Sequence, residues 1–349
     1  MVTFNRRQTI GLIGAAAATG LAAPAIAQNK KIVVGALRFT SHSGSFIAVE
    51  RGHFAEAGLD VELEFFQAAQ PMAVAIASGD IDYAVTAISG GLINLADKGA
   101  IKVIGGALSE EPGIDGQKIL ASNDAHAAGL TSPAALDGKT WAVTQAGSSF
   151  HYMGSKIAAA EGASLKFKPL QKVGAIIGAM KSSQVDAWSI VPHIAKGLGG
   201  AGAVQIIGDV ADYIPNYQVT TVFTSADNAA NERAATEGFV KAFSAGAADF
   251  NAALVDKTAG DGTDMVKLIH KYVYADREFA KAEKSIRAGS MRINQGAALN
   301  VTSVEDQLNW FKSEGLIDGD VSTGMLLDTS GTYTGELARA QIIINYLAT

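Results

Sequence analysis

The sequence predicts an α/β protein of two similar, doubly wound lobes, and three observations support this prediction. The 349-residue chain is 48% hydrophobic and 18% charged, which is typical of a globular protein long enough for two domains. Apolar strand-like runs alternate with helical patterns, the order expected of parallel sheets covered by helices. A stretch at residues 40–82 recurs 104 residues later. Two copies are too few for a solenoid and instead predict two lobes with a ligand between them.

The repeat aligns residues 40–82 with residues 144–186 without a gap. Nine of the 43 aligned positions are identical, and the matches fall at equivalent structural points. Asp82 aligns with Asp186 in the third predicted strand of each copy. Because the two aspartates share a repeat position, we expect them to have a common structural task, such as binding the backbone amides of loops.

The first 27 residues have the pattern of a cleaved export signal. Arg6 and Arg7 precede an apolar run at Ile10–Ala23, and Ala25–Ala27 forms an A-x-A cleavage site. The paired arginines favour twin-arginine export, with ordinary Sec export as the alternative. We therefore expect a soluble periplasmic protein that begins at Gln28.

The composition argues against several classes of partner and cofactor. The net charge of −6 argues against a nucleic-acid partner, which requires a basic face. There is no cysteine, so the fold depends on core packing rather than disulfides, and no lipid anchor follows the cleavage site. The six histidines lack the paired spacing of a metal site. We expect a monomer with no metal and no cofactor.

The first copy of the repeat begins with a strand and a helix. Lys31–Leu37 is a continuous apolar run, as expected for a strand buried on both faces. A helix is predicted at Phe46–Ala57, and Gly58 ends it. Val61–Phe65 alternates apolar and acidic residues, as in an edge strand. Pro71, a favoured first-turn residue, opens a helix that runs to Ser78.

The strand Ile81–Thr86 then completes a βαβαβ unit, half of a doubly wound sheet. A helix at Gly91–Lys98 and a strand at Ile101–Gly106 extend the first lobe. The second copy repeats the order of strand, helix, strand, helix and strand at Trp141–Thr144, Phe150–Glu161, Leu165–Phe167, Gly174–Ser182 and Val185–Ile190.

Two segments are expected to join the lobes. Lys118–Ser122 crosses to the second lobe and Gln218–Thr224 crosses back. Lobe one then comprises residues 28–117 and 225–349, and lobe two comprises residues 118–224. The C-terminal part is helical and should complete lobe one and brace the hinge, with helices at Glu232–Asn251, Thr263–Tyr274, Glu278–Ala288, Val304–Ser313 and Ala338–Ala348.

Several motifs resemble those of one known family. Glu50–Phe54 is followed by Ala77–Asp82, which resembles an "SGxID" turn. Leu136–Val143 resembles an "LKGKKVAV" strand, and Gln184–Trp188 a "VDAW" strand. On these residues the chain resembles the nitrate/sulfonate/taurine class of periplasmic substrate-binding proteins of ABC importers, which are related to pyrimidine-precursor binders. The resemblance covers residues 30–225, with all elements in the family order.

The resemblance implies a two-lobed periplasmic binding protein of type II, which closes on a small molecule and delivers it to the permease subunits of an ABC importer. One departure affects the ligand. The family often has an acidic residue after "VDAW" and before proline, and the chain instead has Ser189–His193 there. The resemblance therefore does not carry over to any particular ligand.

The leading interpretation is a solute-binding protein, not an enzyme, for a small organic anion such as a sulfonate or carboxylate. The alternative ligand is an aromatic or heterocyclic compound, such as an aromatic acid or pyrimidine precursor, held by Phe39, Trp188 and Tyr152. The rival class is an enzyme on the same fold, like the pyrimidine-forming relatives in eukaryotes. Those relatives use a cysteine-rich motif, and this chain has no cysteine. A sensor that presents its ligand to a membrane receptor stays open as a third class.

The candidate ligand-binding residues follow the strand ends, where open α/β sheets bind ligands. Helix N-termini there favour an anion, with simple capping as the alternative for the serines. Ser45 and Ser149 share a repeat position and are expected to form two halves of one anion site. Arg38 could pair with a ligand anion or a neighbouring acid, and Trp188 could stack on the ligand or fill the core. The full set is Arg38, Phe39, Ser41, His42, Ser45, Thr86, Ser89, Ser148, Ser149, Phe150, His151, Asp186 and Trp188.

One further motif has an ordinary explanation. Gly197–Gly202 fits G-x-G-x-x-G, but it follows a predicted helix and precedes a predicted strand at Val204–Ile207. A dinucleotide site requires the reverse order, so we expect a loop.

Overall fold

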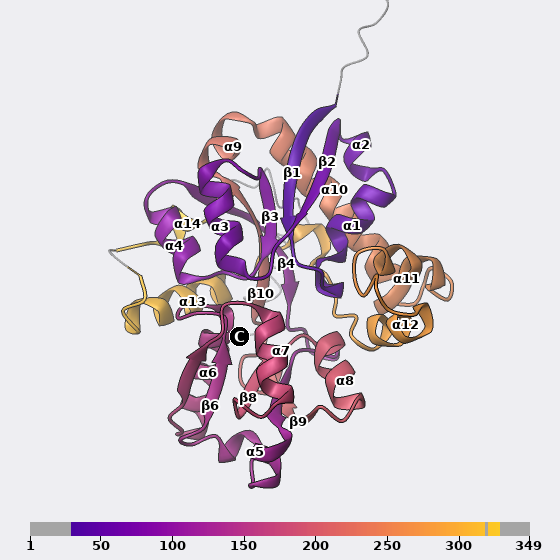
Figure 1. Cartoon of the computed structure of the whole chain (residues 1–349). Helices are drawn as coiled ribbons and strands as arrows, with labels where there is room; N and C mark the ends of the chain where they lie inside the picture. Colours follow the sequence, from indigo (N-terminus) through magenta and orange to yellow (C-terminus); the bar gives the residue numbers. More distant parts are fainter. Residues whose placement is uncertain (1–28, 318–319, 329–349) are drawn as a thin grey trace, which may run out of the picture.

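The computed structural model of the chain describes residues 29–317 and 320–328. The expected export signal, residues 1–27, and the expected helix Ala338–Ala348 lie outside the described residues. Within them the chain forms two lobes, each built on a five-stranded sheet with helices around it (Figure 1). None of the helices in this part of the chain is long and apolar enough to cross a membrane. The prediction of an α/β protein with two doubly wound lobes is confirmed.

The first sheet has the strand order β2-β1-β3-β10-β4. Strand β1 is an interior strand and pairs in parallel with β2 and β3, which agrees with its continuous apolar run. Strand β10 runs antiparallel to both β3 and β4. The bounds are β1 Lys30–Ala36, β2 Leu59–Phe65, β3 Tyr83–Thr86, β4 Ile101–Ser109 and β10 Gln218–Ser225.

The second sheet repeats this plan in the order β7-β6-β8-β5-β9. Strand β6 pairs in parallel with β7 and β8, and β5 runs antiparallel to β8 and β9. Each strand of the second sheet thus has a counterpart at the same place in the first. The internal repeat predicts this for the three parallel strands of each sheet, and the equivalence of β5 with β10 and of β9 with β4 goes beyond it. The bounds are β5 Lys118–Ser122, β6 Thr140–Val143, β7 Lys166–Pro169, β8 Ala187–Ile190 and β9 Val204–Asp209.

The chain crosses between the sheets twice, just before β5 and just before β10. The segments expected to cross, Lys118–Ser122 and Gln218–Thr224, are these two strands themselves, and each pairs within the sheet that the chain has just entered. The crossing stretches are bonded together, because the amide of Glu110 donates to the carbonyl of Tyr217 over 2.9 Å. Since β10 belongs to the first sheet, we propose that lobe two ends at Tyr217 rather than at residue 224.

The aligned aspartates perform the same structural task in the two lobes. The Oδ2 atom of Asp82 accepts a hydrogen bond from the amide of Val33 over 2.7 Å. The Oδ2 atom of Asp186 accepts one from the amide of Thr140, also over 2.7 Å. Each carboxylate therefore ties the start of the third strand to the first strand of its own sheet. The predicted common task is confirmed, although the amides lie in strands rather than in loops.

The helices of lobe one differ from the prediction at one point. The helix expected at Phe46–Ala57 is two helices, α1 and α2, separated at Arg51 and Gly52. Gly52 has φ +78°, a left-handed conformation that interrupts a helix and that glycine adopts without a steric cost. The first four helices are α1 Ser43–Glu50, α2 His53–Glu56, α3 Ala69–Ser78 and α4 Gly90–Asp97, and a short 3₁₀ turn at Thr40–His42 precedes α1.

The helices of lobe two follow the predicted order. They are α5 Asn123–Ala127, α6 Ser149–Glu161, α7 Val173–Lys181 and α8 Pro192–Gly200. The loop expected at Gly197–Gly202 is wrong for most of the motif, because α8 continues through Gly200 and only Ala201 and Gly202 form the turn before β9.

The C-terminal helices cover lobe one and reach the second lobe. Helix α10 packs along α1 at a close approach, because a Cβ atom on Gly44 would lie 2.8 Å from the ring of Phe243. Helix α13 reaches α6 of lobe two, where Lys156 pairs with Asp306 over 3.0 Å. The bounds are α9 Ala226–Asn231, α10 Arg233–Phe250, α11 Thr263–His270, α12 Phe279–Ala288, α13 Val301–Ser313 and α14 Thr323–Leu326.

Candidate functional site

A small chamber lies between the two lobes, beside the crossing segments. Its volume is about 60 Å³, which suits a small polar group rather than a whole drug-sized molecule. Both lobes line it with polar residues from the strand ends where the sequence predicts binding. The predicted site residues that it brings together are Phe39, Ser41, His42, Thr86, Ser148, Ser149 and Phe150.

Three hydroxyl groups on the chamber wall have no hydrogen-bond partner among the described residues. They belong to Ser41 of lobe one, Ser148 of lobe two and Thr220 of β10. All three side chains are at most 6% exposed. A buried hydroxyl left without a partner costs about 1–3 kcal/mol. These three hydroxyl groups are therefore available to form hydrogen bonds with a polar group in the chamber.

Two helix N-termini add donors at the same place. Helix α6 begins at the chamber residues Ser149 and Phe150, and α3 begins at the chamber residue Ala69. Ser148 stands at the N-cap position of α6 but makes no side-chain capping bond, and Ala68 before α3 has no side chain that could cap. The unsatisfied amides and the positive dipole end of a helix favour an anion.

His42 contributes a neutral ring to the chamber. Its Nδ1 atom accepts a hydrogen bond from the amide of Leu37 over 3.3 Å, which leaves the Nε2 atom to carry the hydrogen. Burial lowers the pKa of His42 to about 3. The edge of its ring meets Phe39 at a centroid distance of 5.8 Å. His42 is therefore a neutral hydrogen-bond donor at neutral pH.

A larger outer pocket adjoins the chamber and shares Leu37, Phe39 and Val173 with it. Its volume is about 710 Å³, within the range of ligand-binding clefts. Helices α7 and α8 of lobe two provide an apolar wall. Three cationic side chains also line the outer pocket, namely Arg38, Lys181 and Arg277. Neither the outer pocket nor the chamber has a carboxylate among its described lining residues.

Four titratable side chains of this lining were not among the site residues predicted from the sequence, namely Lys181, His193, Tyr274 and Arg277. Tyr274 and Arg277 come from the segment after α11, far from the repeat that guided the prediction. His193 follows the proline of the altered "VDAW" region, so its unusual context was the one available signal.

The remaining predicted site residues lie outside the chamber. Ser89 accepts from the amide of Leu92 and so caps α4. His151 accepts from the amide of Gly147 and meets Trp310 edge-on. Ser45 is fully buried in α1 and does not line either pocket among their described residues.

Trp188 and Asp186 occupy structural positions. Trp188 is fully buried behind Phe150, with the two ring centroids 5.5 Å apart. Asp186 binds both the amide and the hydroxyl group of Thr140. Arg38 does line the outer pocket, where it lies over the ring of Phe65.

Direct contacts hold the lobes together around the site. The amide of Gly90 in lobe one donates to the carbonyl of Gly147 in lobe two over 2.9 Å. His193 of α8 lies 2.9 Å from the hydroxyl oxygen of Tyr274, measured from its Nδ1 atom. These bonds from separate elements describe a closed arrangement of the two lobes.

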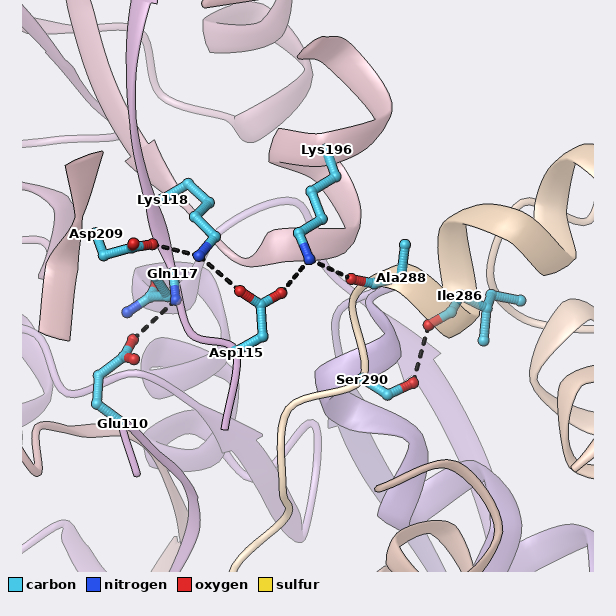
Figure 2. A network of polar contacts seen from close by, with 9 residues as sticks. All are labelled: Glu110, Asp115, Gln117, Lys118, Lys196, Asp209, Ile286, Ala288 and Ser290. Carbon is cyan, nitrogen blue, oxygen red and sulfur yellow. Dashed lines mark hydrogen bonds and ion pairs between the residues drawn. The ribbon is translucent and has the colours of Figure 1, made fainter. Parts of the chain in front are cut away.

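Charged groups gather where the chain crosses between the lobes (Figure 2). Asp115 lies between Lys118 and Lys196 and contacts both. Lys118 also pairs with Asp209 at the end of β9. Burial would lower the pKa of Lys118, but its bonds to Asp115 and Asp209 outweigh burial and raise that pKa, so Lys118 is positively charged at neutral pH.

A model of the family described as "NMT1/THI5 like" matches residues 39–253, which is more than half of the chain. The chain belongs to the NMT1/THI5-like family. No curated protein matches its sequence.

Solved structures place this NMT1/THI5-like chain in the periplasmic binding protein fold. The alkanesulfonate-binding protein SsuA from Xanthomonas axonopodis pv. citri, bound to MOPS, is 16% identical with a TM-score of 0.67, covering 85% of this chain and 97% of that one. The nitrate-binding protein NrtA from Synechocystis PCC 6803 is 15% identical with a TM-score of 0.64, covering 84% of each chain. The resemblance drawn from the sequence motifs is thus confirmed.

One similar structure is an enzyme rather than an importer component. A mutant of DSZB in complex with biphenyl-2-sulfinic acid is 11% identical with a TM-score of 0.53, covering 90% of this chain and 99% of that one. The fold therefore does not by itself decide between binding and catalysis, and function has to be argued from the site. Among the described residues, no cluster of three potential ligands could hold a metal ion.

Proposed function

We propose that the protein is a periplasmic solute-binding protein that captures a small organic anion, a sulfonate or carboxylate, between its lobes and delivers it to an ABC importer. The observation that carries the proposal is the set of unpartnered hydroxyl groups of Ser41, Ser148 and Thr220 at the chamber. Helix N-termini offer donors only, so the group they bind has to be rich in acceptors. An anionic oxygen group meets this requirement without a carboxylate nearby to repel it.

The alternative, a neutral aromatic or heterocyclic ligand, has less support in the geometry. Of the three aromatic residues proposed to hold such a ligand, Phe39 lines both pockets, whereas Trp188 and Tyr152 are fully buried. An aromatic acid remains compatible with the site, because its carboxylate would occupy the chamber and its ring would meet Phe39. An aliphatic anion and an aromatic acid would thus both place an anionic group in the chamber.

Calorimetry on two serine variants tests the proposal. Alkanesulfonates and short carboxylates are titrated first against the wild-type protein to find a ligand. We expect Ser148→Ala to weaken its binding about tenfold to a hundredfold, because a hydrogen bond to a charged group contributes about 1.5–3 kcal/mol. Ser45→Ala is the matched control, since this serine is also buried and unpartnered but lies outside the chamber.

Equal affinities for Ser148→Ala and wild type would contradict the chamber as the anion site. Mass spectrometry of the ligand after long incubation separates binding from catalysis, because a binding protein returns the ligand unchanged. The same titrations with neutral aromatic compounds decide whether the alternative ligand class applies.

A further inference from the structure

Two arginines on the outer pocket are held in an unusual way. Arg51, Arg287 and Arg292 each pair with a carboxylate. Arg38 and Arg277 have no such ion pair among the described residues and instead lie over aromatic rings. The protein as a whole has a net charge of −6. Two exposed guanidinium groups that line the same pocket, neither of them paired with a carboxylate among the described residues, therefore make this part of the surface positive.

The rings position both guanidinium groups without using up their hydrogen-bond donors. The Cζ atom of Arg38 lies 3.7 Å from the ring centroid of Phe65, and its Nη1 atom donates to the carbonyl of Tyr272 over 3.2 Å. The Cζ atom of Arg277 lies 4.0 Å from the ring centroid of Tyr274. A guanidinium group presents five N–H donors in a fixed fork, so both arginines keep donors free for an anion.

The segment that carries Arg277 is itself fixed. Tyr274 has φ +62°, an unfavourable conformation for a bulky residue that persists only where the surroundings impose it. His270 imposes it from one side, with its Nε2 atom 3.0 Å from the carbonyl oxygen of Tyr274 and 3.1 Å from that of Arg277. The bond from the Tyr274 hydroxyl to His193 of lobe two fixes the ring from the other side.

Most of the other residues that line the outer pocket are apolar. Helix α7 supplies Ile177 and helix α8 supplies Ile194 and Leu198. Val173 and Phe39 line both the chamber and the outer pocket, so the two spaces adjoin at these residues. The outer pocket therefore offers apolar surface to the part of a ligand that lies outside the chamber.

We propose that the outer pocket binds a second anionic group, so that the ligand is an elongated dianion with an apolar middle. This inference rests on the proposed function, because it takes the chamber as the site of the first anionic group. The second group, a carboxylate, sulfonate or phosphate, lies between the guanidinium groups of Arg38 and Arg277. Lys181 adds a third positive charge at the same pocket.

Matched series of compounds test the proposal. Alkanesulfonates are compared by calorimetry with ω-carboxyalkanesulfonates of the same chain length, and monocarboxylates with α,ω-dicarboxylates. We expect one chain length at which the dianion binds about tenfold more tightly than its matched monoanion, which corresponds to ~1.4 kcal/mol. The preference of the wild-type protein should shrink as the salt concentration rises, because the arginines are exposed.

Arg277→Gln should reduce the preference for the dianion, because it removes one of the three cations at the outer pocket, and it should weaken binding of the dianion more than binding of the monoanion. Arg51→Gln is the matched control, because this arginine is exposed but pairs with Asp249, away from both pockets. Its affinities for both members of each pair should equal those of the wild type. Melting temperatures of both variants show that they remain folded.

Two results would overturn the inference while leaving the proposed function intact. One is that no dianion of any length binds more tightly than its matched monoanion. The other is that Arg277→Gln weakens monoanion and dianion equally, which would mean that a single anionic group occupies the outer pocket. The proposed function fails in a different way, namely when none of these anions binds or Ser148→Ala has no effect on those that do.

Discussion

At the scale of single residues, Glu110 is the buried carboxyl group at the point where the two crossing segments meet. It is 2% exposed, and its Oε1 atom accepts a hydrogen bond from the amide of Gln117 over 3.1 Å (Figure 2). Its Oε2 atom has no partner among the described residues. Burial raises the pKa of Glu110 to about 7, against the lowering effects of the bond from Gln117 and the charge of Lys118.

This raised pKa predicts that Glu110→Gln stabilises the protein above neutral pH. The unfolded carboxyl group loses its proton near pH 4.5, whereas the folded one keeps it to about pH 7. The folded state thus binds more protons in this window, so the free energy of unfolding falls as the pH rises through it. The amide variant has no such penalty. Its melting temperature should exceed that of the wild type at pH 8 and approach it near pH 4.

Glu62→Gln on the exposed face of β2 provides the control for the replacement of one carboxyl group by an amide. A constant difference for Glu110→Gln across the same range would show that the pKa of Glu110 is the same in the folded and unfolded states, which would contradict the effect of burial.

At the scale of elements, helix α8 and the segment after α11 form a contact between the lobes that is sensitive to protons. Burial, with smaller effects from His42 and Arg277, lowers the pKa of His193 to about 3. The His193 ring is held between Phe39 and Tyr274 in the closed arrangement. Separation of the lobes would remove Tyr274 and Phe39 and expose the ring, so the pKa would return toward its usual value of 6.5.

Ligand affinity should therefore fall as the pH is lowered below about 6.5. The closed form binds fewer protons than the open form between that pH and about 3, so protonation of His193 favours opening. The expected slope is at most about tenfold in the dissociation constant per pH unit for this one group. His193→Gln should bind with a flatter pH profile, and His126→Gln, in α5 and away from the pockets, should retain the wild-type profile.

If the affinities of the wild type and His193→Gln have the same pH profile, the lobes do not release His193 when they open. Simple anions with low pKa values serve best as ligands here, because their own charge stays constant over the range.

The elements themselves could largely be predicted from the sequence, because hydrophobic periodicity is local and the repeat shows each pattern twice. The pairing of β10 between β3 and β4 could not, because a strand chooses its neighbours through contacts with residues far along the chain. The same reason explains the site. Ser41 and Ser148 follow predicted strands, whereas Arg277 reaches the pocket only through the packing of Tyr274 against His193.

At the scale of the whole molecule, the two lobes are joined by paired crossing segments and closed over the chamber by a few direct bonds. The bond from Gly90 to Gly147 and the contact of His193 with Tyr274 are the kind that hinge motion breaks. A ligand that bridges both lobes adds contacts present only in the closed form, so it shifts the population toward that form.

Small-angle scattering should therefore show a smaller radius of gyration at saturation with ligand than in its absence. Ser148→Ala at the same ligand concentration provides the control, because weaker binding leaves a larger share of the molecules open. An unchanged radius of gyration at proven saturation would contradict closure on the ligand.

The position of β10 also has a consequence for how the protein is made. Strand β10 lies in the middle of the first sheet, between β3 and β4, yet it is synthesised after the whole second lobe. Until the ribosome has passed Ser225, the nascent first lobe presents two unpaired strand edges, which are sites of misassembly. The strands of the second sheet, β5 to β9, are continuous in sequence and can assemble first. The lobe that begins the chain is thus the one that finishes folding last.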